Sequence, residues 1–156
     1  LTNIEQNSDS EKNKSEEILF PNDPSILGRI VKVELNKEKI KTFESLIVEI
    51  SYELYTERIP NFLIGVAIYT PEREYIFGPN TYLDRVNIPN ELGKHTVKYI
   101  IKKMPLLSGV YNLDVGIFSQ KGLVCIDYKN DCKTFTVGND YISEGKYYIE
   151  HEWEID

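Results

Sequence analysis

The sequence predicts an all-β protein built as an antiparallel β-sandwich of about eight strands. Apolar side chains occupy every second position from Tyr111 to Ile117 and, over a longer stretch, from Leu46 to Leu54. This alternation is the period of a strand with one buried face. Turn residues separate the apolar stretches at short intervals, and no segment has the periodicity of an amphipathic helix. Both features are typical of antiparallel sandwiches.

The same alternation places the individual strands. We expect strands at residues 28–35, 44–55, 61–69, 74–77, 95–103, 106–118, 123–128, 132–137 and 147–153. In the first of them, Val31, Val33 and Leu35 should face the core because they alternate with charged residues. Charged segments and turn residues predict the connections, which should lie at residues 36–42, 70–73, 78–81, 82–92, 120–122, 129–131 and 138–145.

Two of the expected strands have an unusual second face. The outward positions of residues 61–69 include Gly65 and Ala67, and those of residues 106–118 include Gly116. If the two strands lie in one sheet, these small residues leave a shallow trough on its outer surface. The rim of that trough would carry Tyr69, Asn112, Asp114 and Phe118.

Such a trough suits a sugar, because aromatic rings stack on the apolar faces of sugar rings and carboxylate or amide groups bond their hydroxyls. An equally open interpretation is that a neighbouring loop fills the trough. On the first interpretation the carbohydrate-binding residues are Tyr69, Tyr75, Asn112, Asp114 and Phe118.

Composition limits the number of domains and the class of partner. A chain of 156 residues, 41% of them hydrophobic, is long enough for one well-filled core. Residues 1–17 are polar and predict a linker, which leaves residues 18–156 as the folded domain. The chain begins with Leu, so we expect it to be part of a longer or processed protein. A net charge of −7 argues against a nucleic-acid partner.

Motifs for catalysis, cofactors or metals are not evident. The sequence has neither a Gly-x-Ser-x-Gly nucleophile motif nor a phosphate-binding P-loop. His95 and His151 are expected to be structural or solvated, and the oxygen-rich stretch at residues 127–131 to be a turn. We therefore expect no catalytic residue, no cofactor and no metal. Cys125 and Cys132 are expected to be reduced thiols, although a short hairpin between them would also allow a disulfide.

The order of these features resembles the C-terminal domain of Wzt-type polysaccharide ABC transporter ATP-binding proteins. The resemblance covers residues 18–153 and consists of strand-end residues rather than a catalytic motif. Its parts are Gly65–Tyr69, Ile76–Thr81, Leu106–Tyr111, Leu113–Phe118, Asp127–Tyr128, Phe135–Val137, Gly145 and Trp153. Pro79 departs from the usual Gly-x-Asn-Thr spacing and leaves the role of Asn80 and Thr81 open.

The resemblance implies an immunoglobulin-like sandwich that follows an ATPase domain through the linker. It implies recognition of a bacterial surface polysaccharide, such as an O-antigen, so that only a finished chain is exported. It further implies a homodimer in which residues 147–153 pair across the interface. The parent protein would be a peripheral subunit that meets the membrane subunit at the cytoplasmic face of the inner membrane.

Two other classes of function remain open at this stage. One is a sandwich that joins protein subunits through an exposed edge strand and binds no sugar. The other is a secreted adhesin or carbohydrate-binding module, which a disulfide and an upstream signal peptide would favour.

Overall fold

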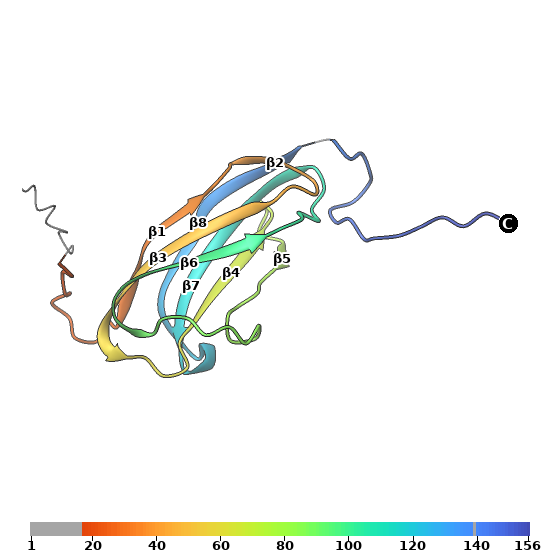
Figure 1. Cartoon of the computed structure of the whole chain (residues 1–156). Helices are drawn as coiled ribbons and strands as arrows, with labels where there is room; N and C mark the ends of the chain where they lie inside the picture. Colours follow the sequence, from red (N-terminus) through yellow and green to blue (C-terminus); the bar gives the residue numbers. More distant parts are fainter. Residues whose placement is uncertain (1–16, 139) are drawn as a thin grey trace, which may run out of the picture.

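The structure is an all-β sandwich of two sheets. The computed structural model describes residues 17–138 and 140–156. One sheet has three strands in the order β1-β3-β6, and the other has five in the order β2-β8-β7-β4-β5. Figure 1 shows the two sheets face to face, with the described N-terminal residues at one end and the C-terminal segment leaving from the other. The predicted fold class is confirmed.

The described residues contain eight strands and one short 3₁₀ turn. They are β1 (Gly28–Leu35), β2 (Lys39–Lys41), β3 (Leu46–Arg58), β4 (Leu63–Tyr69), β5 (Tyr75–Phe77), β6 (Glu91–Ile101), β7 (Gly109–Ser119), η1 (Gln120–Gly122) and β8 (Val124–Gly138). None of these elements is a helix with the length and apolar character needed to cross a membrane.

The core lies between the sheets and is filled from β3 and β7. The alternating apolar residues of both strands are buried, as the sequence predicts. They meet the inward residues of β4 and β8, including Val66 and Phe135, in one continuous cluster. Tyr52 is buried in this cluster, and its hydroxyl donates a 2.6 Å hydrogen bond to the Pro89 carbonyl. The polar tip of this large ring is therefore satisfied within the core.

β8 departs from the predicted pattern. Residues 129–131, which predict a hairpin turn, lie inside one continuous strand. Leu113 pairs with Lys133 and Val115 with Lys129, so Asp114 alone stands opposite residues 130–132. The turn-like residues form a bulge, which adds residues to one strand without reversing its direction.

β1 also contains an irregularity, at the step between Ile30 and Lys32. The bulge shifts the inward face, so that Ile30 and Val33 are buried while Val31 is 48% exposed. The prediction that Val31 faces the core is therefore wrong. Strict alternation cannot report the extra residue of a bulge.

Two further segments differ from expectation. Residues 36–42, predicted to be a loop, contain β2, which runs parallel to β8, so the sandwich is not wholly antiparallel. Residues 147–153 form no strand within this chain. Leu106 and Tyr147 make one isolated bridge, and the segment then extends away from the sandwich (Figure 1).

Leu113→Ala should lower the free energy of unfolding by roughly 2–5 kcal/mol, because it opens a cavity in the centre of the core. Leu113 is fully buried, whereas Val110 on the same strand is 44% exposed. Val110→Ala is therefore the matched control, with an expected change within about 0.5 kcal/mol. Urea denaturation followed by circular dichroism measures both variants. Equal losses would contradict this placement of the core.

Candidate functional site

The floor of the candidate site comes from the pairing of β4 with β7. Gly65 lies opposite Gly116, and Ala67 lies opposite Asp114. The two strands thus lie side by side in one sheet, as the trough requires. Because paired residues point to the same face of a sheet, the small residues gather on the outer surface of the five-stranded sheet.

A groove of about 250 Å³ lies over Gly65 and Ala67. Its length follows β4 from Tyr69 to Leu63, and Phe118 lies opposite Leu63 at the far end. The loop after β5 supplies one wall, with Gly78, Pro79 and Asn80. The remaining lining residues are Val66, Tyr75, Asp114, Lys121, Gly122 and Tyr128. The trough inferred from the sequence is therefore open over Gly65 and Ala67, whereas the rings of Phe118 and Tyr128 cover Gly116.

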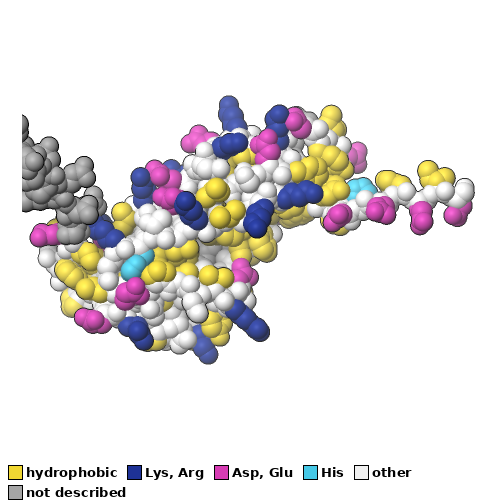
Figure 2. Space-filling model, in the orientation of Figure 1, with side chains coloured by type: hydrophobic (Ala, Val, Ile, Leu, Met, Phe, Trp, Pro, Cys, Tyr) yellow, Lys and Arg dark blue, Asp and Glu magenta, His cyan; other side chains and the backbone are white. Residues whose placement is uncertain are grey.

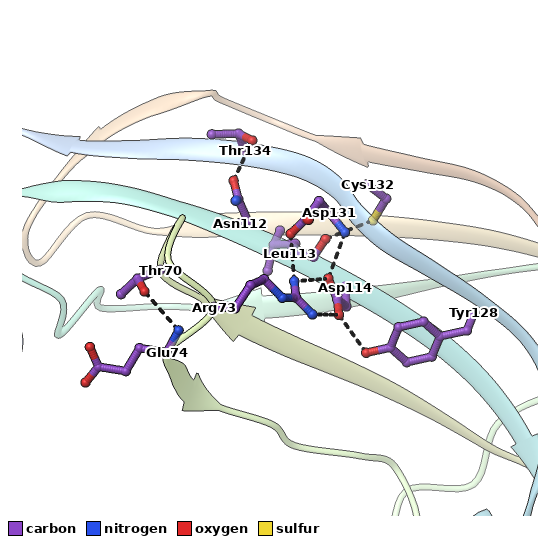
Figure 3. A network of polar contacts seen from close by, with 10 residues as sticks. All are labelled: Thr70, Arg73, Glu74, Asn112, Leu113, Asp114, Tyr128, Asp131, Cys132 and Thr134. Carbon is purple, nitrogen blue, oxygen red and sulfur yellow. Dashed lines mark hydrogen bonds and ion pairs between the residues drawn. The ribbon is translucent and has the colours of Figure 1, made fainter.

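The polar centre beside the groove is the carboxylate of Asp114, which is fully buried. Arg73 donates to it through both terminal nitrogens, at 3.1 Å to Oδ1 and 2.9 Å to Oδ2. The hydroxyl of Tyr128 donates to Oδ2 at 2.7 Å, and the backbone amide of Asp131 donates to Oδ1 at 2.7 Å. Figure 3 shows these groups converging on Asp114 from the turn before β5 and from β8.

Arg73 is held in place by more than this ion pair. Its Nη1 also contacts the carboxylate of Asp131 at 2.7 Å, and its guanidinium carbon lies 3.9 Å from the centre of the Tyr69 ring. Arg73 itself has a positive φ of 66°, in a turn closed by hydrogen bonds with Thr70. A side chain from a tight surface turn is thus fixed over the sheet by a bidentate pair and a ring contact.

Burial and hydrogen bonding in this network determine the protonation of Asp114 and Tyr128. Burial raises the pKa of the Asp114 carboxyl, but the bonds from Arg73, the Asp131 amide and Tyr128 outweigh it and leave the pKa below its ordinary value. Burial and the bond to Asp114 both raise the pKa of the Tyr128 hydroxyl. Asp114 is therefore ionised and Tyr128 neutral at physiological pH.

Two glycines allow aromatic rings to approach the backbone here. A Cβ on Gly116 would lie 2.6 Å from a carbon of Phe118 and 2.7 Å from one of Tyr128. A Cβ on Gly78 would lie 1.5 Å from the Tyr75 hydroxyl. By contrast, a Cβ on Gly65 would make only ordinary contacts at 3.8 Å or more. Gly116 and Gly78 therefore set the positions of the rings, whereas Gly65 leaves space in the floor.

The structure brings together four of the five predicted binding residues. Tyr69, Tyr75, Asp114 and Phe118 line the groove, and the Tyr69 and Tyr75 rings lie 5.0 Å apart. Asn112 is the exception, because its side-chain oxygen accepts a 2.7 Å bond from Thr134 and it does not line the groove. Asp114 lies beneath the surface, so it positions Arg73 and Tyr128 and has no exposed oxygen to offer a ligand.

Sequence reasoning missed Arg73, Tyr128 and Lys121. Tyr128 pairs with Gly116, so reading β8 as one strand would have placed its ring on the groove face. Arg73 and Lys121 lie in turns with left-handed backbone, for which the sequence carries no spacing signal. Among the described residues, no group of three His, Cys, Asp or Glu side chains is arranged to hold a metal. Cys125 and Cys132 are free thiols on the same strand.

Asp114→Asn should destabilise the domain in a pH-dependent way. Its folded-state pKa is lowered, so the carboxylate stabilises the fold above its unfolded pKa of about 3.9, and this contribution is lost as the pH falls further. We expect a loss of about 2–3 kcal/mol at pH 7, less than for a fully buried pair because Arg73 is 39% exposed. Denaturant unfolding of both proteins from pH 7 to pH 3 should show this difference shrinking below about pH 4.

Asp131→Asn is the control for this variant, because it removes a half-exposed partner of the same arginine. We expect it to cost less than about 1 kcal/mol. A loss from Asp114→Asn that stays constant down to pH 3 would contradict the assigned ionisation.

Comparison with solved structures supports the fold. The chain is similar to the crystal structure of the C-terminal domain of Wzt, with a TM-score of 0.73, 16% sequence identity, and coverage of 83% of this chain and 84% of that one. It is less similar to a Bacteroides uniformis β-glucuronidase, with a TM-score of 0.48 and 11% identity over 66% of this chain and 14% of that enzyme. The latter likeness is too distant to bear on fold or function.

Sequence comparison gives the family. A search of the curated proteins found no match. The family model described as the Wzt C-terminal domain matches residues 28–149, which include all eight strands and the whole groove. The chain belongs to the Wzt C-terminal domain family, whose members are carbohydrate-binding rather than catalytic domains associated with ABC transporters.

Proposed function

We propose that the groove over Gly65 and Ala67 binds the bacterial surface polysaccharide exported by the parent transporter, an O-antigen or a glycan like it. Binding would occur at the cytoplasmic face of the inner membrane, where the parent protein contacts the membrane subunit, and would couple completion of the glycan to its export. The observation that carries this proposal is an open groove with a floor of small residues and walls of aromatic rings.

The arrangement of the rings supports a sugar as the ligand. Arg73 covers the ring of Tyr69, so that ring is partly occupied. Tyr75 is 58% exposed, and its ring is tilted against that of Tyr69 with 5.0 Å between the ring centres. Phe118 lies at the other end of the groove, where its ring and that of Tyr128 make an edge-to-face contact. Tyr75 and Phe118 are therefore the stacking surfaces that a sugar ring would meet.

We also propose that the domain forms a homodimer through residues 147–153. Ile149 and Trp153 are exposed, and they alternate with Glu150 and Glu152. Figure 2 shows hydrophobic and acidic side chains along this extended segment. A stretch with one apolar and one acidic side has the pattern of a strand that pairs with a sheet edge. A second copy of the chain offers such an edge in β5 and β6.

Tyr75→Ala should weaken binding of the polysaccharide purified from the source organism by about five- to tenfold, because it removes an exposed stacking ring. ¹⁵N NMR titration of the 156-residue chain measures the affinity and locates the shifts. Tyr82→Ala removes a similarly exposed ring outside the groove and should leave binding unchanged. Binding without shifts at the groove would move the site elsewhere, and no binding by the folded wild type would favour a protein-interaction domain.

Trp153→Ser should weaken dimerisation by about tenfold or more, since it removes the largest apolar side chain of the segment. Trp153 is 87% exposed in the single chain. Sedimentation equilibrium measures the dissociation constant, and Ile142→Ser, at an equally exposed position outside the segment, is the control. A wild type that stays monomeric at high micromolar concentration would contradict the proposed dimer.

A further inference from the structure

One end of the groove carries a cation held in an unusual backbone conformation. Gln120, Lys121 and Gly122 have successive positive φ angles of 49°, 60° and 97°. Two non-glycine residues in the left-handed region are disfavoured, and such strain is often found where it places a functional side chain. The amides of Gln120 and Lys121 donate to the carbonyls of Pro60 and Asn61 at 3.4 and 3.3 Å. This turn brings Lys121 to the wall of the groove.

Lys121 is the one lining residue whose charge is available to a ligand. Of the other lining residues, only Asp114 is ionisable to a charged form at neutral pH, and it is buried and paired with Arg73. Arg73 in turn is shared between two carboxylates, those of Asp114 and Asp131. Lys121 makes no ion pair with any other residue in the described part of the chain.

The position of Lys121 separates it from the Arg73 network. Lys121 and Gly122 lie near Leu63, whereas Arg73 contacts Tyr69 six residues further along β4. The acidic centre, Asp114, lies opposite Ala67, four strand residues or about 13 Å from Leu63, which is longer than the screening length of about 8–10 Å at physiological salt. The acidic network therefore leaves the field of the ammonium at its own end of the groove largely intact.

The net charge of the protein bears on which ligand this cation would recognise. A chain with a net charge of −7 repels anionic ligands at long range. A glycan that carries acid groups would therefore need a specific positive group inside the site. A ligand without acid groups would offer the ammonium of Lys121 only hydroxyl acceptors and no opposite charge.

We infer that the groove selects an acidic sugar residue, whose carboxylate or phosphate contacts Lys121 while its ring stacks on Phe118 at the same end of the groove. This inference rests on the proposed function and specifies its ligand. Lysine presents a compact point charge with three donors, which suits either type of anion without bidentate geometry. Lys121 is then a specificity-determining residue of the site.

The test uses the polysaccharide purified from the source organism in three forms: native, carboxyl-reduced, and dephosphorylated. ¹⁵N NMR titration of the 156-residue chain at 50 mM and 300 mM salt measures each affinity. We expect one of the two treatments to weaken binding by about two- to fivefold at low salt, and less at high salt, as for an exposed ion pair. The treatment that does so identifies the acid group as a carboxylate or a phosphate.

Variants assign the preference to one side chain. Lys121→Gln should bind the native and the treated polysaccharide equally, whereas Lys121→Arg should retain the preference. Lys102→Gln is the matched control, because it removes the same charge from an exposed position outside the groove. Thermal melting confirms that all three variants are folded.

The inference would be overturned if the native polysaccharide contained no acidic residue, if neither treatment weakened binding, or if Lys121→Gln kept the preference. In each case, binding of the native form with shifts at the groove would leave the proposed function intact. Absence of binding by every form would instead overturn both.

Discussion

The site depends on one buried carboxylate. Asp114 lies on the outward face of β7, where a charged side chain is normally solvated, yet it is fully buried and accepts four hydrogen bonds. Because an ionised group is tolerated in such a position only when its oxygens are satisfied, its partners must be present together. These partners come from the turn before β5, from the ring of Tyr128 and from the bulge in β8. One carboxylate thereby joins the turn before β5 to two places in β8.

The bulge in β8 follows from the same requirement. Asp131 has a positive φ of 45°, which turns its amide toward Asp114 and its carboxylate toward Arg73. A regular strand would place one residue opposite Asp114, and its amide would pair with the backbone of β7 rather than with a side chain. The irregular pairing therefore exchanges ladder hydrogen bonds for bonds to a charged group, which are individually stronger.

The sequence predicts the parts of this structure that depend on alternation. The apolar residues at every second position of β3 and β7 are buried, and β7 pairs with β4 without a register shift, so the period of the side chains is sufficient to place them. The groove floor is predictable for the same reason, since Gly65 and Ala67 fall at the outward parity of β4. Register carries this information because a slip by one residue would exchange the two faces.

Alternation fails where the structure depends on turns and bulges. Lys129, Asn130 and Asp131 are typical turn residues, but long-range bonds to Asp114 and Arg73 hold them within a strand. Arg73 and Lys121 reach the groove because of left-handed backbone in short connections, which no pattern of residue types reveals. In residues 147–153 the strand period is present, but it does not specify which sheet edge the segment would pair with. Local pattern thus predicts faces, whereas tertiary partners decide where the chain reverses.

The two proposed interaction sites meet at the hairpin that carries β5. Arg73 ties this hairpin to Asp114, and the adjacent Glu74 forms an ion pair with Lys146, just before the segment that leaves the sandwich. The two ties differ in strength. The Glu74–Lys146 pair is exposed on both sides, and such pairs contribute about 0–1 kcal/mol, whereas the Asp114 pair is bidentate and half-buried. The position of Tyr75 in the groove is therefore set mainly within one chain, and dimerisation through residues 147–153 can adjust it only slightly.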